Sequence, residues 1–220
     1  MLVFGHAGHP VVLFPTSQGR FYEYKDFGLI EAARHHVEAG RVKLYCPDSI
    51  DGASWYNRGI HPADRVKTHM AYENVIVHEV FAHARADTGR PRVAVAGCSF
   101  GGYHAVNVAL RHPDQVGHLF SMSGAFDIRQ FLDGYYDDNV YFNNPVDYLA
   151  GLGDPWFLHH LGHMGIVLGV GEWDICLAAN QDFSRQLDAR GIRHWFDLWR
   201  WAKHDWPLWR DMFPRYLAQL

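Results

Sequence analysis

The chain has 220 residues, with 20 Lys and Arg against 24 Asp and Glu, and a formal net charge of -4 at pH 7. This length suits one domain, residues 1–220, with a sizeable core, and the negative charge argues against nucleic acid as a partner. No apolar run is long enough to span a bilayer, so no membrane partner is expected, and the N-terminus does not resemble a secretion signal. The three cysteines are widely spaced along the chain, which predicts reduced thiols and a cytoplasmic location.

The first half of the chain contains two short apolar runs. Residues 11–14 form a run without alternation, which favours a strand covered on both faces, and the turn-forming sequence Thr-Ser-Gln-Gly follows at 16–19. Parallel sheets bind ligands at the carboxyl ends of their strands, so residues 16–19 are expected at such an edge. Asp26 is expected to cap a helix that ends at Gly40, and residues 42–45 form the next predicted strand.

An irregular segment and a long helix come next. Residues 49–59 have no regular pattern and include Ser-Trp-Tyr-Asn at 54–57. This segment is either a surface loop with aromatic anchors or one wall of a binding pocket. Residues 61–86 have apolar positions near one helical face, which predicts a long helix.

A glycine-flanked serine organises the middle of the chain. A short apolar strand at 92–96 is followed by Gly-Cys-Ser-Phe-Gly-Gly at 97–102 and by helical spacing to residue 111. This is the G-x-S-x-G pattern in a strand-turn-helix context, which predicts a nucleophilic Ser99. A serine on so sharp a turn needs neighbours without side chains, and Gly97 and Gly101 meet that need. The alternative is that these small residues only let the strand and the helix pack.

The second half continues the alternation of strands and helices. Strands are predicted at 118–122, 166–170 and 194–198, a polar loop at 133–144, and helices at 146–152, 156–161, 176–189 and from Pro207 to Leu220. This alternation predicts an α/β fold with a mainly parallel sheet that helices cover on both faces.

A nucleophilic serine needs a base and a group that orients the base. Asp174, just after the strand at 166–170, is the preferred acid, although an aspartate there is also a natural helix cap. Asp127 also follows a strand end and is the rival, whereas Asp182 is expected inside a helix and Asp197 inside a strand. These acids follow Ser99 in the chain, as in the nucleophile-acid-histidine order of α/β-hydrolases.

His204 is the preferred base. It lies in the loop between the last strand and the last helix, which can bring an imidazole across to Ser99, and Pro207 fixes the helix start just beyond it. The alternative is a solvated loop histidine, which is realistic because the chain has 16 histidines. His104 is nearer in sequence, but the helix that begins at the turn carries it away from Ser99.

Acyl transfer also needs donors for an oxyanion. The backbone N–H after the nucleophile, that of Phe100, is the first expected donor. Ser17 is the preferred source of the second, from the loop after an early strand, with Thr16 next.

The other histidines and the tryptophans do not indicate a cofactor. His159, His160 and His163 place two imidazoles on one helical face, but no Cys or Glu at ligand spacing joins them, so no metal site is expected. Five tryptophans near the C-terminus are either packing residues or an aromatic surface for an acyl acceptor: Trp195, Trp199, Trp201, Trp206 and Trp209.

Together these residues resemble the putative esterase family of α/β-hydrolases, which includes esterase D, the S-formylglutathione hydrolases and the antigen 85 mycolyltransferases. The matching marks are residues 97–102, Gly171 with Asp174 and Asn180, and His204-Asp205-Trp206-Pro207 with Trp209-Arg210. The resemblance implies an α/β-hydrolase fold with a minimal cap, a Ser99, His204 and Asp174 triad, an ester or thioester as substrate, and no cofactor. Family members usually carry a glycine where Thr16 precedes Ser17.

The leading interpretation is therefore a serine hydrolase that cleaves a small-molecule ester or thioester through an acyl-enzyme. An acyltransferase on the same triad is one alternative, and a non-catalytic binding module on a hydrolase scaffold is another.

Overall fold

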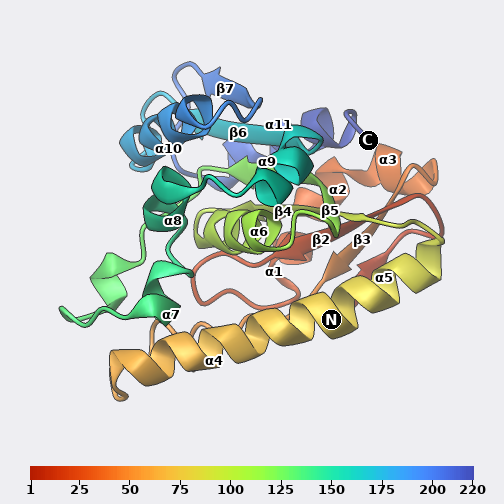
Figure 1. The fold of residues 1–220 in the computed structure, drawn as a ribbon. Helices are drawn as coiled ribbons and strands as arrows, with labels where there is room; N and C mark the ends of the chain where they lie inside the picture. The colour runs from red at the N-terminus through yellow and green to blue at the C-terminus, as the bar shows by residue number, and fades with distance from the viewer.

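A seven-stranded sheet forms the centre of the molecule in the computed structural model, which describes residues 1–220 (Figure 1). The strands are β1 (Leu2–Phe4), β2 (His9–Phe14), β3 (Val42–Cys46), β4 (Val93–Cys98), β5 (Val116–Met122), β6 (Gly165–Gly171) and β7 (Trp195–Trp199). Their spatial order is β1-β3-β2-β4-β5-β6-β7, and every neighbouring pair is parallel except the antiparallel pair β1 and β3. The expected mainly parallel sheet is confirmed.

Helices cover both faces of this sheet (Figure 1). The α-helices are α1 (Glu23–Asp26), α2 (Leu29–Ala32), α3 (Arg34–Glu38), α4 (Pro62–Val75), α5 (Phe81–Thr88), α6 (Phe100–Arg111), α7 (Asp138–Tyr141), α8 (Pro145–Gly151), α9 (Pro155–Gly162), α10 (Leu177–Ala189) and α11 (Trp206–Leu217). A π-helical turn, η1 (Ile76–Val80), joins α4 to α5, and a 3-10 turn, η2 (Arg129–Phe131), precedes α7. None of these helices is both long and apolar enough to cross a lipid bilayer.

The core has two layers because strand side chains alternate between faces. In β2, Val12 and Phe14 pack on the face covered by α4 to α6 and α8 to α10, whereas Val11 and Leu13 pack on the face covered by α1, α2 and α11. A strand buried on both faces has no polar side to present, and this explains the continuous apolar run in its sequence.

Three parts of the chain differ from expectation. The single helix expected from Asp26 to Gly40 is two short helices, α2 and α3, and Asp26 ends α1 instead of capping a longer helix, because Gly28 adopts a left-handed backbone with φ 78°. The polar loop expected at 133–144 contains the short helix α7. The edge strand β1 is additional; its three residues are too few for a periodic pattern.

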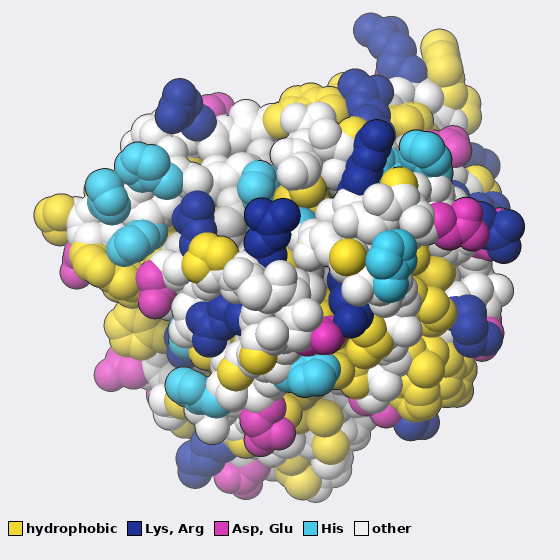
Figure 2. Space-filling model, turned by 90° about the vertical axis from the view of Figure 1, so that its right-hand side faces the viewer, with side chains coloured by type: hydrophobic (Ala, Val, Ile, Leu, Met, Phe, Trp, Pro, Cys, Tyr) yellow, Lys and Arg dark blue, Asp and Glu magenta, His cyan; other side chains and the backbone are white.

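The carboxyl ends of β2, β4, β5, β6 and β7 meet at one edge of the sheet because these strands are parallel. The loops that follow them therefore lie along that edge. Elsewhere, acidic, basic and histidine side chains are interspersed on the face shown in Figure 2.

Candidate active site

Ser99 lies on a strained turn between β4 and α6. Its backbone has φ 56° and ψ −121°, a conformation that non-glycine residues rarely adopt. A Cβ atom on Gly97 would lie 2.2 Å from the carbonyl carbon and oxygen of Gly101, so the chain can close this turn only without side chains there. The turn exposes the hydroxyl of Ser99 above the carboxyl end of the sheet, as a nucleophile requires.

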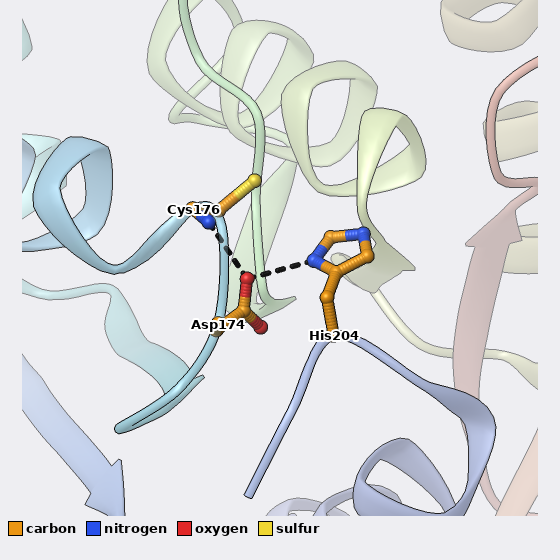
Figure 3. Close-up of side chains that lie close together, drawn as sticks. All are labelled: Asp174, Cys176 and His204. Atoms are coloured by element: carbon orange, nitrogen blue, oxygen red, sulfur yellow. Dashed lines mark hydrogen bonds and ion pairs between the residues drawn. The ribbon is translucent and has the colours of Figure 1, made fainter.

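His204 joins Ser99 to Asp174. Its ring Nε2 lies 3.0 Å from the Oγ of Ser99, and its Nδ1 lies 2.8 Å from the Oδ1 of Asp174. Figure 3 shows the side chains of Asp174 and His204 pointing toward each other from two separate loops. An ionised carboxylate only accepts hydrogen bonds, so Nδ1 carries a hydrogen and the neutral ring offers the lone pair of Nε2 to Ser99. The three side chains predicted from the sequence thus lie together.

The loops that carry His204 and Asp174 are held against each other. The N–H of Trp173 donates to the carbonyl of Ala202 at 2.9 Å, and a Cβ on Gly171 would lie 2.3 Å from that same carbonyl oxygen. The Oδ1 of Asp174 also accepts the backbone N–H of Cys176 at 2.7 Å, and its side chain is fully buried. The carboxylate can therefore fix the His204 ring in one orientation.

A second layer supports the imidazole. The indole of Trp209 in α11 packs edge-on against the His204 ring, with centroids 5.1 Å apart, and its Nε1 donates to the Oγ of Ser123 at 2.9 Å. Ser123 follows β5 and also has a left-handed backbone, with φ 56°. No role for Ser123 is predicted from the sequence, and its position directly after a strand end was the available signal.

Burial and hydrogen bonding oppose each other in the titration of this pair. Burial alone would lower the pKa of His204, but its hydrogen bond to Asp174 and the nearby side chain of Cys176 outweigh burial and raise the pKa to about 9. Burial would raise the pKa of Asp174, but the hydrogen bonds from His204 and from the N–H of Cys176, with the hydroxyl of Ser123 nearby, lower it below its ordinary value. Both shifts favour the charged pair over the neutral one.

The loop after β2, residues 15–19, packs directly on the turn that carries Ser99. A Cβ on Gly101 would lie 2.2 Å from the carbonyl oxygen of Phe14 and 2.6 Å from that of Pro15. We call residues 15–19 the β2 loop. Its contact with Gly101 brings residues expected as oxyanion donors to the nucleophile.

The two expected donors differ in how their N–H groups are used. Phe100 is the first residue of α6, so its N–H has no acceptor within the helix. The N–H of Thr16 donates to the carboxylate of Glu23 at 2.5 Å, whereas the N–H of Ser17 makes no hydrogen bond within the protein. Of the two residues left open by the sequence, Ser17 therefore has the free donor.

The rival residues lie outside this hydrogen-bonded chain. Asp127 accepts bonds from Arg129 and Asn144, and Asp182 is in α10 while Asp197 is in β7, as expected. His104 is buried in α6, where its Nε2 bonds to the carboxylate of Asp51 at 2.8 Å and not to Ser99. The sequence does not predict this pair, because nothing in the local sequence links two residues 53 positions apart.

Two groups of side chains have potential metal ligands. Directly after α9, His163 bonds through Nδ1 to the backbone carbonyl of His159 in that helix. Asp174, Cys176 and His204 place an oxygen, a sulfur and a nitrogen within 4.8 Å of one another (Figure 3). A cation there would have to displace the hydrogen between His204 and Asp174, so we assign these atoms to the hydrogen-bonded chain with Ser99.

Exposed aromatic residues flank the site. Trp173 and Trp201 are 53% and 67% exposed, and their rings pack edge-on at 5.4 Å on the two loops that carry Asp174 and His204. Of the two interpretations of the five tryptophans near the C-terminus, packing agrees with the structure, since only Trp201 is largely exposed and Trp209 is buried. In the segment 54–57, Trp55 is a buried anchor and Tyr56 packs edge-on against Phe100 at 5.6 Å.

The larger cavities lie away from Ser99. One of about 460 Å³ is lined by Arg111, Phe142, Tyr148 and Phe157 at the far end of α6. Because α6 has 12 residues, about 18 Å of helix separates this cavity from Ser99. A shallower polar hollow of about 370 Å³ lies beside the β2 loop.

The fold and this site define an α/β-hydrolase. Residues 47–220 match the model of the family described as "Putative esterase", and the chain belongs to that family. It is thus a serine carboxylester hydrolase, which confirms the class expected from the sequence.

Solved structures share the fold at low sequence identity. A ferulic acid esterase matches with a TM-score of 0.76 and 17% identity, over 97% of this chain and 84% of that one. The S-formylglutathione hydrolase FrmB of Staphylococcus aureus matches with a TM-score of 0.70 and 17% identity, over 100% and 82%. MPT51 of Mycobacterium tuberculosis matches with a TM-score of 0.70 and 16% identity, over 99% and 90%. A comparison of the sequence with curated proteins gives no match.

Proposed function

We propose that this protein cleaves a small-molecule carboxylic ester or thioester through a Ser99, His204 and Asp174 triad and an acyl-enzyme intermediate. The observation that carries the proposal is the His204 ring, which bonds to Ser99 through one nitrogen and to Asp174 through the other. A serine hydroxyl is a weak nucleophile by itself, and this arrangement is the one that activates it.

The residues act in two half-reactions. His204 Nε2 takes the proton of Ser99 as Oγ bonds to the substrate carbonyl carbon, and the N–H groups of Phe100 and Ser17 bind the resulting oxyanion. The carbon-oxygen or carbon-sulfur bond then breaks, and the proton on Nε2 passes to the leaving alcohol or thiol. Water attacks the acyl-enzyme with His204 as base, which releases the acid and restores Ser99.

The nucleophile is tested by labelling with a fluorophosphonate probe and by turnover of p-nitrophenyl acetate. Wild-type protein should be labelled and should hydrolyse the ester, and Ser99→Ala should abolish both while the far-UV circular dichroism spectrum stays unchanged. Ser184→Ala is a matched control, because Ser184 bonds to His194 in another part of the molecule. Folded wild-type protein that is neither labelled nor active would favour a non-catalytic binding module.

The acid is tested by comparing two aspartates at strand ends. Asp174→Asn should lower kcat by about 10³- to 10⁴-fold, because the ring of His204 loses the carboxylate that selects its tautomer. Asp127→Asn should leave kcat within a few fold, because Asp127 bonds to Arg129 and Asn144 only. The reverse ranking would assign the acid to Asp127.

Acyl transfer to another acceptor would use the same residues. A panel of p-nitrophenyl esters of increasing acyl length, assayed with and without added alcohols, measures pocket size and separates hydrolysis from transfer. A hydrolase should release the free acid whichever alcohol is present. We also propose a cytoplasmic location, which the three free cysteines support.

A further inference from the structure

The carboxylate of Asp51 lies beneath the β2 loop and touches two elements of the site. Asp51 is 1% exposed, and its Oδ2 accepts the backbone N–H of Gln18 at 3.1 Å. Its Oδ1 accepts from His104 Nε2 at 2.8 Å, which places the hydrogen of that ring on Nε2. One buried carboxylate therefore connects the β2 loop to α6.

The bond to Gln18 fixes an unfavourable backbone conformation. The N–H of Gly19 donates to the carbonyl of Thr16 at 2.9 Å and closes a four-residue turn, in which Gln18 is third and has φ 54°. Turns with a positive φ at the third position normally require glycine there. The peptide N–H of Gln18 points to Asp51 only while this conformation is kept, so the carboxylate holds a turn that the residue itself disfavours.

A second buried carboxylate acts on the other side of Ser17. Glu23 is 8% exposed, and it accepts both the backbone N–H and the hydroxyl of Thr16. The N–H groups that precede and follow Ser17 are thus tied to Glu23 and Asp51, while that of Ser17 makes no bond within the protein. Rotation of the loop would break one of these bonds before it could redirect the free N–H.

The other end of Asp51 reaches the element that carries the first donor. His104 is buried in α6, stacked on Phe14 with ring centroids 5.9 Å apart and edge-on to Phe100 at 5.0 Å. Phe100 begins the same helix and presents the other free N–H. The pair Asp51 and His104 therefore lies between the two donor-bearing elements.

We propose that Asp51 is a positioning residue, which sets the separation and direction of the N–H groups of Phe100 and Ser17 through His104 and Gln18. The inference rests on the proposed function, since it takes those two groups as the oxyanion donors. Asp51 does not touch the substrate. Its effect falls on the charged transition state and not on the uncharged ground state, so it changes kcat more than KM.

The test is Asp51→Asn, which keeps the size of the side chain. Gln18 and His104 donate to different oxygens of Asp51, and in asparagine one of these is an NH2 group that cannot accept, so one of the two bonds is lost with the side chain in place. Because loss of one oxyanion donor typically costs about 10²- to 10³-fold, its misplacement should lower kcat about 10- to 100-fold with KM within about 3-fold. Affinity for a trifluoromethyl ketone, to which Ser99 adds to form a tetrahedral alkoxide, should fall by the same factor as kcat/KM.

Asp48→Asn is the matched control. Asp48 is a neighbouring carboxylate that bonds to Arg20 and to the N–H groups of Phe21 and Ser49, and it makes no hydrogen bond to Gln18 or His104. Its replacement should leave kcat, KM and ketone affinity near wild type. The pH midpoint of activity should be unchanged in both variants, because neither aspartate bonds to His204.

Rescue separates positioning from general support of the fold. Glycine adopts the φ of Gln18 without strain, so Gln18→Gly added to Asp51→Asn should restore part of the lost kcat. If Asp51→Asn does not fold, the positioning role is tested by comparing kcat of the variants His104→Gln and His104→Leu. Glutamine keeps a donor for Asp51 and should lose less kcat than leucine; equal losses would overturn the inference.

The outcomes also distinguish this inference from the proposed function. If folded wild-type protein is not labelled by the fluorophosphonate, both the proposed function and the positioning role of Asp51 are contradicted. If wild type is labelled and Asp51→Asn matches Asp48→Asn in kcat and in ketone affinity, only the positioning role is overturned. A loss confined to KM or to the melting temperature, with ketone affinity unchanged, overturns it equally.

Discussion

At His204, two opposing effects set the protonation of a single ring, and the hydrogen bonds prevail. Because the hydrogen bond to Asp174 and the nearby side chain of Cys176 outweigh burial and raise the pKa of His204 to about 9, the ring carries a proton at neutral pH in the free protein. Only the neutral ring can take the proton of Ser99. We therefore expect kcat/KM to rise with pH through the neutral range and to level off near the raised pKa, which a pH profile with p-nitrophenyl acetate measures. A plateau already reached at the ordinary histidine value of 6.5 would contradict this.

The thiol of Cys176 provides a second test at the residue scale. The side chain of Cys176 lies near the imidazole and helps to raise the pKa of His204, so Cys176→Ala should lower that pKa and move the rising part of the pH profile to lower pH. The maximum rate should change little, since Cys176 donates its backbone N–H, not its side chain, to Asp174. Ile175→Ala, at the exposed neighbouring position, is the control and should leave the rising part of the pH profile unchanged.

At the scale of elements, the close approach of α6 to the β2 loop depends on Gly101. A Cβ there would lie 2.2 Å from the carbonyl oxygen of Phe14, a backbone atom that cannot move away alone. Gly101→Ala should destabilise the fold by about 1–3 kcal/mol, as overpacking does, and lower kcat by displacing the β2 loop. Thermal unfolding and turnover measure both effects. Gly162→Ala in α9 has no atom within 4 Å of the added Cβ, and it should leave both unchanged or stabilise slightly.

Helix α4 is tied to α6 by a buried carboxylate that should control acid stability. Burial alone would raise the pKa of Glu73, but bonds and charges from His112 and Arg111 lower it to about 2. Its contribution to stability is therefore full above the ordinary value of 4.5 and is lost as the pH falls through about 2. Glu73→Gln should lower the free energy of unfolding at pH 7 by about 3 kcal/mol, as breaking a buried ion pair does. This difference in the free energy of unfolding should become smaller in acid. Glu79→Gln, at an exposed position, should not change the free energy of unfolding.

The elements also show where sequence patterns fail. The continuous runs in β2 and β4 have no polar alternation because both faces are covered, so their strands were predictable. The interruption at Gly28 was not predictable, because a glycine inside a helical pattern is compatible with a helix until its φ is known. The three-residue β1 depends on pairing with β3, which is a tertiary contact.

At the scale of the whole molecule, the two layers share one sheet, and we propose that they unfold together as one domain. Phe81 is fully buried in one layer and Phe213 in the other. Replacing either by alanine should cost about 3–5 kcal/mol, and in each variant the loss of activity and the loss of far-UV circular dichroism should coincide along a urea gradient. Activity lost in Phe213→Ala at a lower urea concentration than the helical signal would indicate two units.

The site illustrates how far sequence reasoning extends across the molecule. Ser99 has a local signature, and Asp174 and His204 follow from the order in which strand ends reach one edge. The pair Asp51 and His104 has neither signal, because it is created when the loop after β3 meets the interior face of α6. Such a pairing requires the fold to be known first.

The position of His204 in the chain has a consequence for biosynthesis. Ser99 and its turn are translated well before the loop that supplies the imidazole, and that loop precedes α11, whose Trp209 packs against the His204 ring. A nascent chain from which residue 204 has not yet emerged therefore holds Ser99 without its proposed base. Under the proposed mechanism, the serine becomes reactive only after this later segment has folded onto it.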